Sequence, residues 1–93
     1  MDNNLATRIY EAVTIIPKGS VATYSQIAKI AGTSPRVVGN FLHRNKDPKN
    51  IPCHRVVNVK GELAKNYAFG GLREQKRKLL REGVKFMGDK AVL

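Results

Sequence analysis

Two sets of helix start and stop signals lie close together in the first half of the chain, and they constrain the fold more than any other feature. Thr23, with Gln26 three residues later, has the sequence of a capping box at a helix N-terminus. Gly32 provides a left-handed end for that helix, and Ser34 with Pro35 provides a cap and a first-turn proline for the next. Two short helices joined by a glycine-containing turn predict a helix-turn-helix.

The second of these helices, from Pro35 to His43 or Arg44, divides into an apolar and a polar face. The apolar side consists of Val37, Val38, Phe41 and Leu42, and the polar side carries Arg36, Asn40 and His43 or Arg44 at helical spacing. Arginine and asparagine suit a helix that enters a DNA groove, where they meet base edges and phosphates. The alternative is an amphipathic helix whose solvent-exposed face is basic without a nucleic-acid role.

The flanking segments predict a mainly α fold with one short β-hairpin. Asn3 or Asn4 caps a first helix that ends at Pro17. Residues 55–59 and 62–64 predict two strands around a Lys60-Gly61 turn, and residues 72–82 predict a last helix. That last helix groups Leu72, Lys76, Leu79 and Leu80 on one face. A lysine there either extends to solvent or serves a site. We expect a single domain over residues 1–93.

The charge is strongly positive and unevenly distributed. The chain has 17 Lys and Arg against 7 Asp and Glu, for a formal net charge of +10 over 93 residues. Residues 1–35 carry 3 basic and 2 acidic side chains, whereas residues 36–93 carry 14 and 5. Concentrated positive charge favours a polyanionic partner, of which nucleic acid is the commonest. A solvated basic surface is the alternative.

Several classes of protein are excluded by what the sequence lacks. No apolar run approaches the ~20 residues of a membrane helix, and no secretory signal is evident. Cys53 is the single cysteine, which precludes an intramolecular disulfide and suits a reducing compartment. Together with His43 and His54 it falls short of the four ligands of a structural zinc site. We therefore expect no membrane association, no metal and a cytoplasmic location.

The segment Ile51-Pro52-Cys53-His54-Arg55-Val56-Val57 is the best candidate for a reactive site. A free cysteine is more often a small buried hydrophobe than a nucleophile. Cys53, however, follows a rigid proline and precedes a histidine, and neighbouring His and basic groups favour the reactive thiolate. A reactive cysteine in a basic helix-turn-helix protein suggests chemistry on nucleic acid.

These motifs together resemble one known family. PCHRVV lies eight residues after Asn45 and follows a helix-turn-helix that begins VATYSQIAKIAG. This arrangement resembles the DNA-binding and active-site domain of the O6-alkylguanine-DNA alkyltransferases, from about Leu5 to Phe86. The resemblance implies repair of double-stranded DNA containing O6-alkylguanine, by irreversible transfer of the alkyl group to a cysteine of the protein, with no cofactor. It implies that the family's N-terminal domain has no counterpart here, and we expect a monomer.

The resemblance assigns the catalytic residues by position. Cys53 would be the nucleophile and alkyl acceptor. His54 would take the thiol proton through a bound water, and Glu82 would orient His54. Asn45 would brace the loop that carries Cys53, and Tyr24 would help to rotate the nucleotide and protonate the leaving guanine.

The resemblance also assigns DNA and substrate contacts. Arg36, or a displaced neighbour, would fill the vacated place in the base stack, with Asn40, His43 and Arg44 on the same DNA-facing helix. The guanine pocket would use the backbone of Cys53 and Val56, together with Tyr67, Ala68 and Lys76. A shorter turn before Arg36, and inserted residues near Lys65 and between Gly71 and Leu79, distinguish this chain from the family pattern.

Two other functions compete with alkyl transfer. Alkyltransferase-like proteins keep this fold, sense damage without enzymatic activity and recruit other repair, but they carry Trp at the position of Cys53. A transcriptional regulator would use the helix-turn-helix alone and leave PCHRVV without a purpose.

Overall fold

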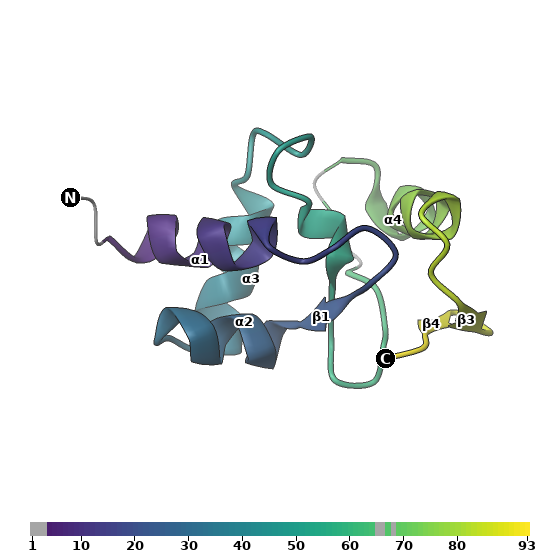
Figure 1. Ribbon diagram of the computed structural model, residues 1–93, viewed down its shortest axis with the longest axis horizontal. Helices are drawn as coiled ribbons and strands as arrows, with labels where there is room; N and C mark the ends of the chain where they lie inside the picture. The colour runs from purple at the N-terminus through teal and green to yellow at the C-terminus, as the bar shows by residue number, and fades with distance from the viewer. Residues whose placement is uncertain (1–3, 65–66, 68) are drawn as a thin grey trace.

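The computed structural model describes residues 4–64, 67 and 69–93 (Figure 1). The elements in chain order are α1 (Leu5–Thr14), β1 (Ala22–Thr23), α2 (Tyr24–Ala31), α3 (Pro35–His43), η1 (Cys53–Arg55), β2 (Val56–Val57), α4 (Gly71–Arg81), β3 (Phe86–Met87) and β4 (Lys90–Ala91). Helices α1, α2 and α3 gather at one end of the molecule, and α4 with β3 and β4 lies at the other (Figure 1). None of the helices in the described ranges is long and apolar enough to cross a lipid bilayer.

The predicted caps of the first three helices are confirmed. The side chains of Asn4 and Ser34 each accept a hydrogen bond from the backbone N–H three residues on, at 2.8 and 3.3 Å. Thr23 and Gln26 form both hydrogen bonds of the capping box, at 2.8 and 3.0 Å. Gly32 ends α2 with φ of +77°, a backbone conformation that glycine adopts without a Cβ penalty. The alternative cap Asn3 lies outside the described residues.

The first hydrophobic cluster joins α1, α2 and α3. Its most buried aliphatic side chains are Ile9, Val13, Ile27 and Val38, at 0–1% exposure. Two side-chain hydrogen bonds to backbone carbonyls tie α1 to its neighbours: Arg8 Nε donates to Ala31 O at 2.9 Å, and Tyr10 Oη donates to Phe41 O at 2.8 Å. These contacts fix the orientation of α3, whose other face remains open.

One short β-hairpin is present, but the hairpin predicted at residues 55–59 and 62–64 was wrong. β2 pairs in parallel with β1, Ala22 opposite Val56, rather than with residues 62–64. Residues 58–62 do form a turn, yet Glu62 makes an isolated bridge to Lys90 in place of a returning strand. The antiparallel hairpin is β3–β4. It packs on the turn because Ala91 N donates to Gly61 O at 2.8 Å, and a Cβ at Gly61 would overlap the Ala91 carbonyl.

Helix α4 begins and ends within one residue of its prediction, but the face it buries differs. Its buried side chains are Gln75 and Leu79, both at 0%, whereas Leu72 and Leu80 are 44% and 52% exposed. Leu79 belongs to a second cluster with Val57, Val84 and Ala91. The rotation of α4 about its axis is set by the packing of Leu79 into this cluster. It is not set by the number of leucines on one face of the helix.

Candidate functional site

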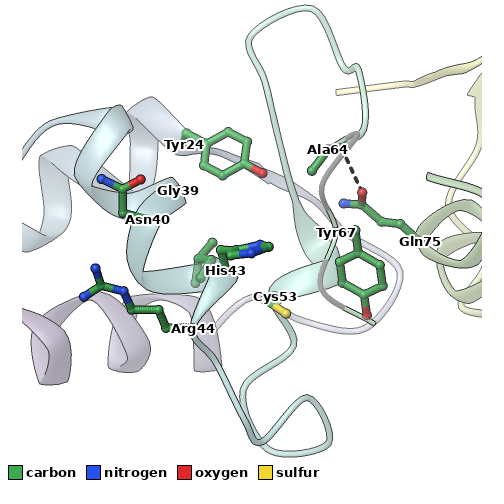
Figure 2. A pocket seen from close by; sticks show the side chains of 10 residues that line it. Tyr24, Gly39, Asn40, His43, Arg44, Cys53, Ala64, Tyr67 and Gln75 are labelled. Carbon is green, nitrogen blue, oxygen red and sulfur yellow. Dashed lines mark hydrogen bonds between the residues drawn. The ribbon is translucent and has the colours of Figure 1, made fainter. Parts of the chain in front are cut away.

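A cavity of about 480 Å³ lies between the open face of α3 and the segment that contains Cys53 (Figure 2). It is lined by Tyr24, Gly39, Asn40, Leu42, His43, Arg44, Cys53, Ala64, Tyr67 and Gln75. The structure thus brings together six of the residues that the sequence predicted for the site. Tyr24 and His43 turn toward the side of the cavity that holds Cys53 and Tyr67, whereas the side chains of Asn40 and Arg44 extend away from it (Figure 2).

Arg36 lies beside this cavity, in a neighbouring groove. The groove is lined by Arg36 together with Tyr24, Gly39 and Val59, so Tyr24 and Gly39 are shared between groove and cavity. Arg36 is exposed in the first turn of α3. Arg36 therefore lies next to the cavity but does not line it.

Asn45 holds the loop before Cys53 through two hydrogen bonds. Asn45 is 4% exposed, its Nδ2 donates to Ile51 O at 2.9 Å, and its Oδ1 accepts from Asp47 N at 2.9 Å. Cys53 N donates to the same Ile51 carbonyl at 2.7 Å, and the Cys53 side chain is buried. Burial raises the pKa of the thiol, and the Asn45 hydrogen bond and the nearby charge of Lys78 oppose that rise.

His54 is fixed by Glu82 and Arg55. His54 Nε2 lies 3.0 Å from Glu82 Oε1, and Arg55 donates two hydrogen bonds to the same carboxylate, at 3.0 and 2.7 Å. Arg55 also donates to Ile16 O at 2.8 Å, which ties this network to the end of α1. Burial would raise the pKa of Glu82, but the hydrogen bonds from Arg55 and His54 outweigh it and lower that pKa.

This arrangement makes His54 a neutral base. Burial lowers the pKa of His54 more than the Glu82 carboxylate raises it, so the imidazole is uncharged at neutral pH. With Nε2–H donating to Glu82, the lone pair lies on Nδ1. Nδ1 is buried and has no hydrogen-bond partner among the described residues. A buried, unpartnered acceptor next in sequence to a cysteine can receive the thiol proton.

The tyrosines of the cavity are held in their protonated form. Burial raises the pKa of Tyr24, and the nearby Cys53 adds to the rise. The same two causes, in the same order, raise the pKa of Tyr67. Both phenols therefore keep their protons across the physiological range and act as hydrogen-bond donors.

Helix α4 presents Gln75 and Lys78 to the site in place of the predicted Lys76. Gln75 Nε2 donates to the carbonyls of His54 and Val56, at 3.0 and 3.1 Å. Its Oε1 accepts from Ala64 N at 2.9 Å, the dashed line of Figure 2. The hydrogen bond from Gln75 thereby fixes the backbone of Val56, which the sequence predicted as a pocket residue.

Lys76 points elsewhere. Its Nζ donates to Asp89 Oδ1 at 3.1 Å and to Gly88 O at 3.3 Å, outside the cavity. Lys78 Nζ instead donates to Tyr67 Oη at 2.7 Å. Helical spacing is a weak signal for both missed residues, since Gln75 stands one turn before Leu79 and Lys78 one turn before Glu82. The predicted pocket residue Ala68 lies outside the described residues.

Within the described ranges there is no group of three or more His, Cys, Asp or Glu side chains that could hold a metal ion. The chemistry available at the site is that of a buried thiol, a neutral imidazole and protonated phenols. Its setting is a helix-turn-helix whose α3 face borders the cavity. A fold and site of this kind define a DNA-binding domain built around a candidate nucleophilic cysteine.

Comparison of the sequence with known protein families also identifies a DNA-binding domain. Residues 4–84 match the family model described as 6-O-methylguanine DNA methyltransferase, DNA binding domain. The chain belongs to this family, and the resemblance carried by PCHRVV and the helix-turn-helix is confirmed.

Curated relatives include both methyltransferases and related proteins. The Methylated-DNA--protein-cysteine methyltransferase of Methanothermobacter thermautotrophicus is 46% identical over 82 residues, which cover 88% of this chain and 46% of that protein. Alkyltransferase-like protein 1 of Schizosaccharomyces pombe is 38% identical over 80 residues, covering 84% of this chain and 74% of the relative. The chain thus spans about half the length of the methyltransferase that it matches.

Solved structures of two such relatives in complex with DNA have the same fold. The S. pombe Atl1 complex with damaged DNA containing O6-carboxymethylguanine matches with a TM-score of 0.79 and 32% identity, covering 98% of this chain and 88% of that one. Mycobacterium tuberculosis OGT in complex with DNA matches with a TM-score of 0.78 and 30% identity, covering 88% and 50%. The predicted fold class, a helix-turn-helix alkyltransferase domain, is confirmed.

Proposed function

We propose that this protein binds double-stranded DNA containing O6-alkylguanine, takes the damaged base out of the duplex and transfers its alkyl group irreversibly to Cys53. The observation that carries the proposal is the single cavity that joins Cys53 to the α3 face. A base within a duplex cannot present its alkylated oxygen to a buried thiol, so the base must leave the stack first. At about 480 Å³ the cavity falls in the size range of small-molecule sites.

The proposed transfer balances without a cofactor. The Cys53 thiol proton passes through a water to His54 Nδ1, and the thiolate attacks the alkyl carbon. The S–C bond forms as the C–O6 bond breaks, and its electron pair stays on the guanine. Tyr24 donates its proton to the leaving base, and proton exchange with solvent restores His54 and Tyr24. Glu82 contributes by holding His54 Nε2, so that Nδ1 is the acceptor.

Intact-protein mass spectrometry after incubation with O6-methylguanine duplex tests this proposal. We expect each molecule to gain one methyl group, located on Cys53 by peptide mapping, and then to react no further. Cys53→Ser should gain none and still bind the duplex, because affinity comes largely from phosphate contacts. Methyl on another residue, or repeated turnover by one molecule, would contradict the mechanism.

Non-enzymatic damage sensing is the second candidate, and one observation favours it. Burial raises the pKa of the Cys53 thiol, which disfavours the thiolate. The same mass experiment discriminates, since a sensor would bind the damaged duplex and leave Cys53 unmodified.

Base extrusion can be separated from chemistry through Arg36. We propose that its guanidinium enters the duplex where the damaged base was, which offsets an unstacking cost of a few kcal/mol. Arg36→Ala should therefore slow transfer from duplex DNA about tenfold or more, and leave reaction with free O6-alkylguanine base within about twofold. Rates on the two substrates at saturating concentration provide the measurement.

Arg44→Ala is the parallel variant, because Arg44 lies on the same helix at the edge of the cavity. Should Arg44→Ala show the duplex-specific defect and Arg36→Ala none, Arg44 would be the inserted residue. Equal losses of Arg36→Ala on both substrates, with a lower melting temperature, would indicate a structural role for Arg36.

A further inference from the structure

Lys78 holds an aromatic wall of the cavity from the side of α4. Its Nζ donates to Tyr67 Oη at 2.7 Å. The same ammonium lies over the rings of Tyr67 and Phe69, at 5.1 and 5.6 Å from their centroids, and those two rings meet edge to face. One charged group thus contacts both aromatic side chains that precede α4.

The same side chain also reaches the base of the site. Lys78 lines a second cavity together with His54 and Glu82, whereas Tyr67 lines the first cavity together with Cys53. The ammonium therefore touches the wall of one cavity and lines the other. Lys78 is partly buried, so its charge is less screened by solvent than that of a lysine on the open surface.

We propose that Lys78 is a positioning residue for the reactive cysteine. Its hydrogen bond fixes Tyr67 against the cavity, and its positive charge favours the Cys53 thiolate while it keeps His54 uncharged. This inference deepens the proposed transfer reaction and rests on it for its biological meaning. The residues proposed for the proton relay, Cys53, His54 and Glu82, do not include a permanent cation, and the neighbouring Arg55 is paired with Glu82.

The electrostatic directions agree with this role. Burial raises the pKa of Cys53, and the charge of Lys78 is among the causes that lower it again. Burial lowers the pKa of His54, and Lys78 acts in the same direction. The titratable and charged groups around Cys53 come from several elements: Tyr24, His43, Arg44 and Tyr67 line its cavity, and Tyr10 and Lys78 interact with it electrostatically. His54 follows Cys53 in the chain and interacts with Arg55 and Glu82.

The pH dependence of Cys53 alkylation by iodoacetamide tests the proposal without DNA. Iodoacetamide is small and neutral, and its reaction forms an S–C bond on the thiolate with loss of iodide. The pKa of His54 is lowered and those of the facing tyrosines are raised, so a rise in rate from neutral to alkaline pH reports the thiol.

Removal of the charge should move this profile. We expect Lys78→Met and Lys78→Gln to react about three- to tenfold more slowly at pH 7.4 and to reach the wild-type rate at high pH, where all thiols are ionised. Lys78→Arg, which keeps the charge, should stay within about twofold of wild type throughout. Lys78→Gln keeps a hydrogen-bond donor toward Tyr67, so it separates charge from hydrogen bonding and also serves if Lys78→Met fails to fold.

Lys85→Met is the matched control, because Lys85 is an exposed lysine that follows α4. Its profile should superpose on that of wild type. Profiles of Lys78→Gln and Lys78→Arg that coincide would overturn the proposal, as would an equal slowing by Lys85→Met.

Methyl transfer from O6-methylguanine duplex, measured in parallel, separates the two hypotheses. If wild type gains no methyl group and the Lys78 variants still shift the iodoacetamide profile, the proposed transfer fails and the role of Lys78 stands. If wild type is methylated and every profile superposes, the transfer stands and Lys78 has no such role.

Discussion

The two ends of this molecule are held together by different kinds of interaction. At the α1–α3 end, each helix follows an N-cap residue whose side chain accepts a hydrogen bond from the backbone N–H three residues on. Aliphatic side chains fill the space between these helices. At the α4 end, the helix has no side-chain cap, and the strands are two residues long. There the fold depends on polar side chains that bond backbone groups far away in sequence, such as Gln75 with His54 and Val56.

This difference in stabilising interactions fits the separate roles that we propose for the two ends, DNA binding and chemistry. The end that would bind DNA needs a rigid helix with one free face, which local caps and an apolar core supply. The end that would perform chemistry needs a thiol, an imidazole and a carboxylate held in fixed relation. Long-range hydrogen bonds supply that relation, because Glu82 reaches back 28 residues to His54 and 27 to Arg55. Substitutions in the two ends should therefore differ in size and in what they damage.

The largest effect should come from Glu82→Gln. The change leaves the Arg55 charge without its ionic partner in a partly buried site, and replaces the carboxylate that fixes His54 with a neutral and weaker acceptor. We expect a loss of about 3 kcal/mol in the free energy of unfolding, since breaking one partner of a buried pair costs a few kcal/mol. Methyl transfer should fall at the same time. Urea denaturation and the mass assay measure the two losses, and an unchanged stability would show that this end does not depend on the network.

The Arg55–Glu82 ion pair also makes the stability of the wild-type protein depend on pH, in the direction set by the pKa of Glu82. The folded-state pKa of Glu82 is lowered, so its contribution to stability is complete above the ordinary carboxyl range of about 4.3 and is lost as pH falls through the lower folded pKa. Glu82→Gln should lack this part of the acid-induced loss.

Two glutamines, one at each end, give the next contrast. Gln75→Leu removes the partners of two buried carbonyls and of Ala64 N–H, and should cost about 2 kcal/mol. Gln26→Leu removes one half of a partly buried capping box and should cost about 1 kcal/mol. Denaturation midpoints of the two variants measure the difference. Equal losses would mean that the two ends are held in the same way.

The smallest effect should come from a cap. Ser34→Ala removes the acceptor for Val37 N at the start of α3, and should cost only about 0.5 kcal/mol because that hydrogen bond is exposed and 3.3 Å long. The iodoacetamide reactivity of Cys53 should not change, because α3 remains packed through Val38 and Leu42. A large change in Cys53 reactivity would show that the two ends are coupled more tightly than their contacts indicate.

The loop and helix positions of the site show what could be predicted and what could not. Asn45, Cys53 and His54 lie within a short stretch whose motif specifies its own local geometry. Lys76 and Lys78 lie two positions apart on one helix, which is a rotation of about 200° around its axis. Helical spacing alone could not decide between them, because the leucines around Lys76 indicated an inward face that the structure leaves exposed.

By itself, the sequence determined where α1, α2 and α3 begin, where α2 ends, and that Cys53 is the candidate nucleophile. Each of these features depends on atoms within a few residues of each other, so the local pattern contains all the information. The tertiary structure alone decided that β1 pairs with β2, that the hairpin is β3–β4, and that Gln75 and Lys78 face the site. The β1–β2 pairing and the contacts of Gln75 and Lys78 join residues 11 to 34 positions apart, and the hairpin packs on Gly61, 30 residues before Ala91. Which partner satisfies a given backbone group therefore depends on how the whole chain packs.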